Sequence, residues 1–383
     1  MKNNHLLMSI GIALFSLGIM WLPFALRAKN LLGIDFAQAG MDRIVSNFDG
    51  INFLVVAKTA YNPELIANSF QDILNGRRPL YFSAHYPGYP MLIALIDIFV
   101  SGPNALLGSV IVSNILLSAA LYLFFESLTK NREKAILLTL VALFFPARML
   151  SNRIVGSNES LFIFFILSSL IAQMKNRKWW SAVFGVFAVL TRSPGILLFG
   201  AYLIQFIFHN LLTKNRKDLM KQLNNFVPYL LIPLALIGLW IFYGHQFGSI
   251  WAYFQVGGNI NIHWPFSVFG SHMDWISGIW NEDLIYLFTL IIGGGIAFLH
   301  KYKWHTSGIF VAIYGLFVIF VAHRDLARYS LPIMPFVIAG LSPILEYRYI
   351  KYIILVMIIP ICLYAWQFVL VNYQPIMDWT RLL

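Results

Sequence analysis

The chain has 383 residues and a net charge of +11, yet only 11% of its residues are charged and 59% are apolar. Its mean hydropathy is +0.72, whereas a water-soluble domain carries charges on about a quarter of its residues. This composition excludes a soluble protein. The positive charge does not indicate nucleic acid as a partner, because the basic residues gather in short loops between apolar runs, as they do in membrane proteins.

Apolar runs of membrane-spanning length recur along most of the sequence, and a helix needs about 20 apolar residues to cross a bilayer. We therefore predict an all-α polytopic membrane protein, with residues 1–383 in a single domain of about ten or eleven transmembrane helices. The first run is expected to remain as a span, because no small-residue cleavage site for a signal peptide follows it. The expected spans are residues 6–26, 105–127, 135–150, 157–174, 179–191, 194–209, 226–244, 284–299, 306–322, 329–345 and 350–372.

Residues 86–101 are too short for a span and begin with Pro and Gly, so we expect a juxtamembrane helix that lies on the outer face or dips into it. With the N-terminus inside, this choice places the basic loops at 128–134 and 210–222 in the cytoplasm, as the positive-inside rule requires. The loops at 27–85 and 245–283 then lie outside. We expect a multi-pass protein of the plasma membrane whose active site faces the non-cytoplasmic side.

Two carboxylates follow or open apolar runs on the expected outer side: Asp49, in Asn-Phe-Asp-Gly, and Glu159, in Gly-Ser-Asn-Glu-Ser. Asp49 could take a proton from a hydroxyl group, and Gly50 would let a ligand approach it closely. Glu159 could help to position substrates. Structural alternatives stay open for both: Asp-Gly is a common turn, and Ser157 or Asn158 would cap a helix whose dipole favours an acid in its first turn.

Three arginines stand at expected outer helix ends, namely Arg192, Arg324 and Arg328. Guanidinium groups bind phosphate oxygens in a bidentate manner, so the three could hold a phosphate. Arg324 and Arg328 would share a face if a helix began before them. The alternative is that each arginine extends to the membrane surface with its charge in water.

The segment Tyr-Phe-Ser-Ala-His-Tyr-Pro-Gly-Tyr-Pro contains His85, Tyr86 and Tyr89 as candidates for substrate binding. A lone histidine of this kind is more often a hydrogen-bonding interfacial residue than a metal ligand. The single cysteine, Cys362, can form neither an internal disulfide nor a thiol-based zinc site and is expected to be a core residue.

No cofactor is expected, because the sequence has no nucleotide-binding motif, no dinucleotide fingerprint and no metal-ligand spacing. Asp274, Glu282 and Asp283 in the second outer loop leave a divalent cation as an open alternative.

Five short motifs follow one another in order: Phe48-Asp49-Gly50, Pro87-Gly88-Tyr89-Pro90, Asn158-Glu159-Ser160-Leu161-Phe162, Leu190 to Gly195, and Arg328-Tyr329-Ser330-Leu331-Pro332. Together they resemble the GT-C superfamily of lipid-linked-sugar glycosyltransferases, and most closely the PIG-V (GPI mannosyltransferase II) branch with its prokaryotic relatives. That branch usually has Trp before the aspartate, where this chain has Phe48.

The resemblance implies an inverting membrane glycosyltransferase that moves a sugar, usually mannose, from a polyprenyl-phosphate donor to a glycan, glycolipid or protein acceptor. Asp49 would be the base, and Glu159 would assist it. The remaining roles that follow are donor-phosphate binding by Arg192, Arg324, Arg328 and Tyr329, and substrate binding by His85, Tyr86 and Tyr89.

Two other classes remain open from the sequence. A lipid or polysaccharide transporter would place ionisable residues midway through its spans, and these span interiors are almost free of charge. A non-catalytic subunit of a glycan assembly complex would use the first outer loop as a docking surface.

Overall fold

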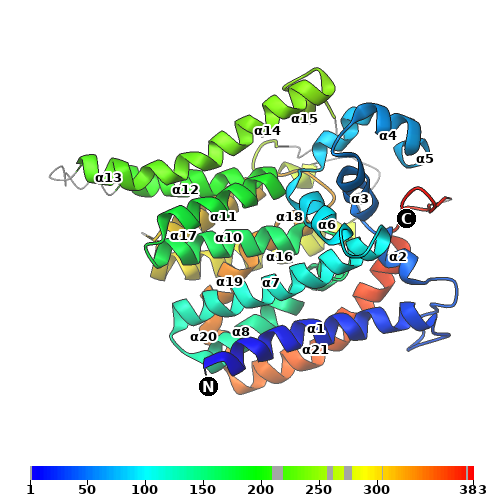
Figure 1. Cartoon of the computed structure of the whole chain (residues 1–383). Coiled ribbons are helices and arrows are strands. Elements are labelled where there is room, and N and C mark those ends of the chain that lie inside the picture. Colours follow the sequence, from blue (N-terminus) through cyan, green and yellow to red (C-terminus); the bar gives the residue numbers. More distant parts are fainter. Residues whose placement is uncertain (1, 209–218, 257–261, 271–277, 304, 377) are drawn as a thin grey trace.

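The computed structural model describes residues 2–208, 219–256, 262–270, 278–303, 305–376 and 378–383 (Figure 1). Every regular element within these ranges is a helix, which confirms the all-α membrane fold. Five helical segments are long and apolar enough to cross a bilayer: Asn4–Leu26, Pro103–Thr129, Gln222–Phe247, Trp280–Tyr302 and Arg348–Val371. They correspond to α1 (Lys2–Leu26), α7 (Pro103–Thr129), α13 to α14 (Leu219–Phe226 and Leu231–Phe247), α16 (Gly278–Tyr302) and α21 (Arg348–Val371).

A sixth crossing is formed if α8 (Arg132–Phe144) and α9 (Ala147–Arg153) are counted together, although they are bent by 77°. The sequence predicted one continuous helix over 135–150, but the structure has a break between α8 and α9. Pro146 has no N–H and disfavours the helical conformation of the residue before it, and Phe145 is accordingly extended, with ψ 138°.

The other expected spans are present as shorter helices. They are α10 (Glu159–Met174), α11 (Lys178–Thr191), α12 (Ile196–Ile207), α17 (Thr306–Phe320) and the broken series α18 (Leu326–Tyr329), η7 (Leu331–Ile333) and α19 (Met334–Gly340). None of these reaches the length of about 20 residues that a direct crossing needs. The positions of the apolar runs therefore agree with the helices, whereas five or six helices of full crossing length are fewer than the ten or eleven expected.

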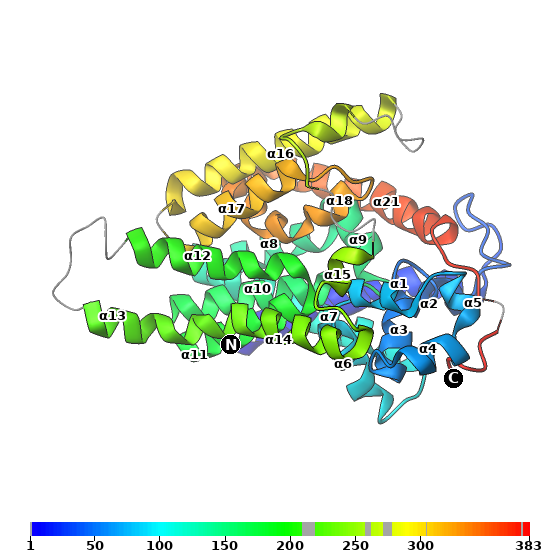
Figure 2. The same ribbon diagram turned by 90° about the horizontal axis from the view of Figure 1, so that it is seen from above.

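The first outer loop folds into short helices that gather at one end of the bundle, together with the C-terminus (Figures 1 and 2). They are α2 (Met41–Val45), α3 (Gly50–Thr59), α4 (Pro63–Ser69), α5 (Gln71–Leu74), η1 (Pro79–Ala84) and α6 (Gly88–Asp97). With ten residues α6 is too short to cross a bilayer, and it is followed by the exposed residues Ile98 and Phe99. This is the geometry expected of a helix at the membrane surface.

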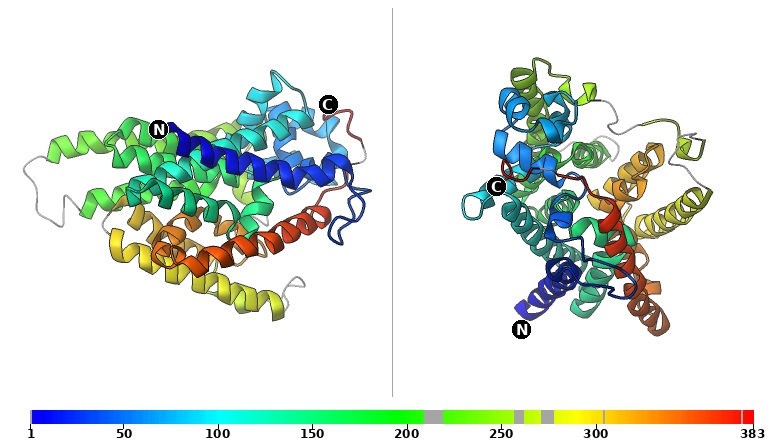
Figure 3. Two further views of the ribbon diagram at one scale, coloured as in Figure 1. Left: turned by 90° about the horizontal axis from the view of Figure 1, so that it is seen from below. Right: turned by 90° about the vertical axis from the view of Figure 1, so that its right-hand side faces the viewer.

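The opposite end of the bundle carries the start of α1, the turn between α7 and α8, and α20 (Ser342–Leu345) (Figure 1). Lys134 and Glu346 form an ion pair there, which joins the turn between α7 and α8 to the start of α21. Viewed along the helices, α16 lies at the edge of the bundle, whereas α10 packs against α7 and α11 (Figure 3, right). The buried helix α10 thus connects the two ends of the protein.

Candidate functional site

A cavity of about 290 Å³ opens at the end of the bundle that carries the outer-loop helices. It is formed where the N-terminus of α3, the segment after η1, the start of α10, the turn between α11 and α12, and the segment before α18 come together. Its walls are formed by Asp49, Phe53, Tyr81, Ala84, His85, Tyr86, Asn158, Thr191, Arg192, Ser193, Pro194, Tyr253, Val256, His323, Arg324, Asp325, Arg328 and Tyr329.

Close packing of two glycines brings the first two carboxylates together. A Cβ atom on Gly156 would lie 2.9 Å from the Cα atom of Gly50, and a Cβ atom on Gly50 would lie 2.6 Å from the carbonyl oxygen of Val45. Gly50 therefore serves the packing of α3 against the segment before α10, while its part in the approach of a ligand to Asp49 stays a prediction. This contact places Asp49 and Glu159 on either side of Arg328.

Asp49 precedes α3 and holds two partners, one on each oxygen. Arg328 Nη2 donates a hydrogen bond to Oδ2 at 3.0 Å, and His85 Nε2 lies 3.6 Å from Oδ1. Burial raises the pKa of the Asp49 carboxyl, but the charge of Arg328 and the contact with His85 outweigh burial and hold the pKa below its usual range. Asp49 is consequently a carboxylate anion at neutral pH.

Glu159 is 1% exposed and lies beneath the cavity, without lining it. Its Oε1 accepts hydrogen bonds from Arg192 and, at 2.5 Å, from Arg328 Nε, while Oε2 accepts one from Ser157. A carboxylate between two guanidinium groups fixes both of them, so Glu159 acts on the cavity through Arg192 and Arg328.

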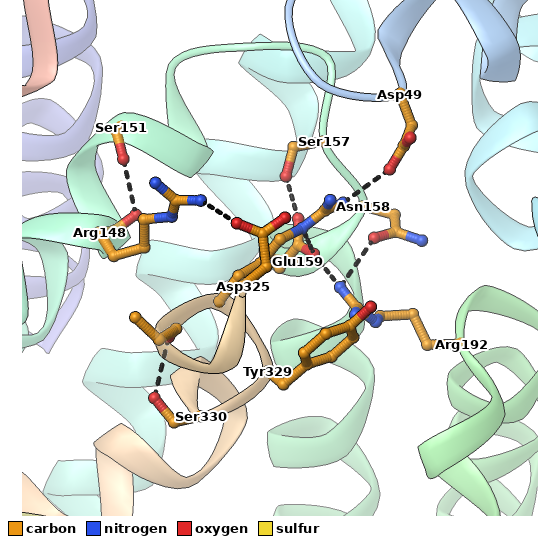
Figure 4. A network of polar contacts seen from close by, with 12 residues as sticks. Asp49, Arg148, Ser151, Ser157, Asn158, Glu159, Arg192, Asp325, Tyr329 and Ser330 are labelled. Carbon is orange, nitrogen blue, oxygen red and sulfur yellow. Dashed lines mark hydrogen bonds and ion pairs between the residues drawn. The ribbon is translucent and has the colours of Figure 1, made fainter. Parts of the chain in front are cut away.

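Asn158 does not cap α10, although it occupies the N-cap position. Its side chain turns toward the next hairpin, where Nδ2 donates to the carbonyl oxygen of Thr191 at 3.1 Å and Oδ1 accepts from Arg192 Nη1 at 3.2 Å (Figure 4). The capping alternative is therefore wrong for Asn158, which instead connects the start of α10 with the end of α11.

The three arginines differ sharply in environment. Arg192 and Arg328 each have side chains that are only 11% exposed and are directed at Glu159, so neither extends to the membrane surface. Arg324 is exposed, lines the cavity and forms no ion pair within the described ranges. Because α18 begins only at Leu326, Arg324 and Arg328 do not share a helix face, and the conditional expectation that they would is wrong.

Of the three residues expected to bind substrate, His85 and Tyr86 line the cavity and Tyr89 does not. His85 and Tyr86 are buried side chains that line the cavity, with the ring of His85 packed against Phe53 and Tyr81. Tyr89 is fully buried away from the cavity and accepts a hydrogen bond from Ser109 at 2.8 Å. Tyr89 thus belongs to the packing of α6 on α7.

Tyr329 lines the cavity beside Arg192, whose guanidinium lies 5.3 Å from the centre of its ring. The ring of Tyr329 also contacts that of His323, with centroids 5.2 Å apart. Tyr329 is therefore placed between the buried arginine and the exposed segment that carries Arg324.

Arg148 is a site residue that the sequence reading missed. Its Nη2 donates to Asp325 Oδ1 at 2.6 Å (Figure 4). Its guanidinium group stacks over the rings of Phe368 and Phe48, at 4.1 and 5.2 Å from their centres. An arginine inside the expected span 135–150 was the available signal, because ionisable residues within apolar runs mark functional positions. Arg148 anchors the segment that carries Arg324.

Tyr253, from α15 (Ala252–Gln255) in the second outer loop, also reaches this cavity, and its hydroxyl lies 3.0 Å from Ser193 Oγ. No pattern in the sequence distinguished this tyrosine from others in the loop. The first and second outer loops thus meet at one site.

No group of three potential metal ligands occurs within the part of the chain that the structure describes. Of the acids considered for a cation, Asp274 lies outside the described residues, while Glu282 and Asp283 are exposed on α16. The carboxylate of Asp49 is already paired with the guanidinium group of Arg328, and this positive charge opposes a metal ion there.

The charges of the site do not cancel. Arg192, Arg324 and Arg328 line the cavity with Asp49 and Asp325, and the contacting residues Arg148 and Glu159 complete the network. Four arginines face three carboxylates, which leaves one positive charge. Arg324 carries it, because the other three guanidinium groups form ion pairs.

No model of a known protein family matches the chain, and no curated protein matches it.

Proposed function

We propose that the chain is a GT-C-type glycosyltransferase that transfers a sugar, with mannose as the first candidate, from a polyprenyl-phosphate donor with inversion. The acceptor is a glycan, glycolipid or protein on the non-cytoplasmic side of the plasma membrane. The observation that carries the proposal is one cavity that brings an anionic carboxylate, Asp49, together with an unpaired guanidinium, Arg324.

The charge of the cavity suits such a donor. A polyprenyl-phosphate sugar is a phosphodiester with one negative charge, and the site has one uncompensated positive charge on Arg324. Arg192 and Arg328 are already held by Glu159 and Asp49, so they act as fixed positive neighbours rather than as free ligands. The network needs no nucleotide pocket, in agreement with the absence of a nucleotide motif from the sequence.

The reaction follows from these positions. A hydroxyl group of the acceptor attacks the anomeric carbon of the sugar while Asp49 accepts its proton. The bond between the anomeric carbon and the phosphate oxygen breaks, and the polyprenyl phosphate leaves with the electron pair. Arg324, with Arg192 and Arg328 behind it, stabilises the charge that develops on the leaving phosphate.

In this mechanism Glu159 is a positioning residue. It holds Arg192 and Arg328 and does not touch either substrate, which differs from the second catalytic role that the family resemblance implied. His85 orients the carboxylate of Asp49 from the opposite side. Tyr86 and Tyr329 form cavity walls against which a sugar ring can lie.

The test is transfer by the purified protein from labelled polyprenyl-phosphate mannose, with polyprenyl-phosphate glucose in parallel, followed by analysis of the anomeric configuration of the product. Asp49→Asn should abolish transfer, and Asp72→Asn, an exposed aspartate of the same outer loop, is the matched control. A wild-type protein that transfers neither sugar to any acceptor of these three classes would contradict the proposal.

A further inference from the structure

A second cavity, of about 440 Å³, lies at the other end of α10. It is enclosed by the last turns of α7, α10 and α12 and by the start of α17. Because α10 begins with Glu159 and ends with Met174, the two cavities are separated by roughly 22 Å at 1.5 Å per residue. The second cavity therefore plays no direct part in the chemistry proposed for the first.

Polar side chains that line this second cavity are joined to one another by hydrogen bonds. Gln205 Oε1 accepts a hydrogen bond from Gln173 Nε2 at 3.4 Å and another from the hydroxyl group of Thr306. No acidic side chain lines the cavity, and its ionisable side chains are Lys130, Tyr302 and His305. Lys130 is exposed and forms no ion pair among the residues that the structure describes. The lining therefore favours an anion over a cation.

A helix N-terminus opens into the same space. The 15-residue helix α17 starts at Thr306, and its N-cap residue His305 makes no side-chain capping bond. The first turn of a helix leaves N–H groups without partners inside the helix and carries the positive end of the helix dipole. Phosphate groups bind at such N-termini.

Ser307 supplies an independent indication of a ligand. Its side chain is on the first turn of α17, is 5% exposed and lines the cavity. Its hydroxyl group forms no hydrogen bond with a described residue and is not among the fully buried polar atoms, so it remains accessible from the cavity. The hydroxyl and the helix N-terminus face the cavity together.

We infer that this cavity binds a phosphate group, with Ser307 and the first turn of α17 as hydrogen-bond donors and with Lys130 and His305 as positive side chains. The inference is independent of the function proposed above. In the topology expected from the basic loops, this end of the bundle lies in the cytoplasm, where lipid headgroups are anionic. Leu128, Leu170 and Met174 give the cavity an apolar wall that an acyl chain can contact. A phospholipid headgroup and a free phosphate share this chemistry.

The experiment uses the purified full-length protein. Native mass spectrometry measures binding of phosphatidylglycerol against phosphatidylcholine, and a thermal shift assay measures binding of inorganic phosphate. Ser307→Ala and Lys130→Gln should each weaken binding about tenfold, because a hydrogen bond to a charged group contributes roughly 1.5 kcal/mol or more. Lys175→Gln is the control, since Lys175 is an exposed lysine at the end of α10 outside the cavity lining.

Selective phosphatidylglycerol binding that both variants weaken would identify a lipid headgroup as the ligand. A thermal shift with inorganic phosphate that both variants weaken would identify a free phosphate. Absence of both signals in the wild type would overturn the inference, as would an equal loss in Lys175→Gln, which would reveal only general surface charge. If Ser307→Ala does not fold, Lys130→Gln still decides the matter, because the exposed Lys130 side chain contributes little to packing.

Discussion

Arg328 joins Asp49 to Glu159: its Nη2 lies 3.0 Å from one Asp49 oxygen and its Nε lies 2.5 Å from Glu159 Oε1. The three residues come from three distant parts of the chain, and the arginine fixes the distance between the surface carboxylate and the buried one. This bridge makes Asp49 an anion held in one orientation. It also means that changes at Arg328 affect both the ionisation of Asp49 and the stability of the site.

The first prediction concerns the base. Asp49→Asn should lower transfer by about 10²- to 10⁴-fold, the usual contribution of a general base. The affinity for the donor should change little, because Arg324 remains. Initial rates and donor titrations with the purified variant measure the two effects. Transfer within a factor of two of the wild type would refute the role of Asp49.

The second prediction concerns pH. The pKa of Asp49 is lowered, so Asp49 is ionised throughout the neutral range and should not produce an acidic limb there in the wild type. Burial raises the pKa of Asp49, and removing the charge of Arg328 takes away the largest influence that lowers it, so the pKa should rise in the variant. In Arg328→Gln, residual activity should therefore fall as the pH is lowered through a range in which the wild type is flat. Rate profiles between pH 5 and 8 test this.

The same shift predicts how pH affects stability. A carboxyl group whose pKa is lower in the folded state stabilises the fold above its unfolded pKa, near 4, and loses that contribution as the pH falls further. Asp49→Asn should therefore narrow the difference between the thermal midpoints at about pH 6 and about pH 2. An unchanged difference would show that Asp49 is not held as an anion by Arg328 and His85.

The third prediction separates the arginines. Arg324→Gln should raise the dissociation constant for the donor by about tenfold or more, since a hydrogen bond to a charged group contributes roughly 1.5–3 kcal/mol. The fold should be unaffected, because Arg324 is exposed and forms no ion pair with any residue that the structure describes. Arg78→Gln, an exposed arginine in the same outer loop, is the control. Equal donor affinity for both variants would exclude Arg324 from phosphate binding.

The fourth prediction concerns the buried carboxylate. Glu159→Gln should destabilise the protein by about 3–5 kcal/mol, because it leaves two buried guanidinium groups without their common partner. Glu282→Gln, on the exposed surface of α16, should stay within about 0.5 kcal/mol of the wild type. Denaturation in detergent measures both. Similar values for the two variants would mean that Glu159 is not a structural centre of the site.

The fifth prediction tests orientation. In a Cys362→Ser background, Glu133→Cys and Asp72→Cys place single thiols at exposed positions on opposite ends of the bundle. In intact cells an impermeant thiol reagent should label position 72 and not position 133. The reverse pattern would place the first cavity in the cytoplasm and would remove the basis of the proposed function.

The sequence by itself determined where the helices lie. The apolar runs match helices because a segment in lipid must satisfy its backbone hydrogen bonds internally, so the hydropathy of each segment is a local signal. The break at Pro146 also follows from a local rule. Asp49, His85, Arg192 and Arg328 could be named as candidates because each lies in an expected outer loop or at an expected outer helix end.

Only the tertiary structure decided which charges are paired. Arg324 and Arg328 are four residues apart, yet one is exposed and the other lies between Asp49 and Glu159. Nothing near Arg148 in sequence reveals its partner Asp325, which follows 177 residues later. Ion pairs of this kind depend on how distant helix ends approach one another, and the approach is set by close packing, as between Gly50 and Gly156.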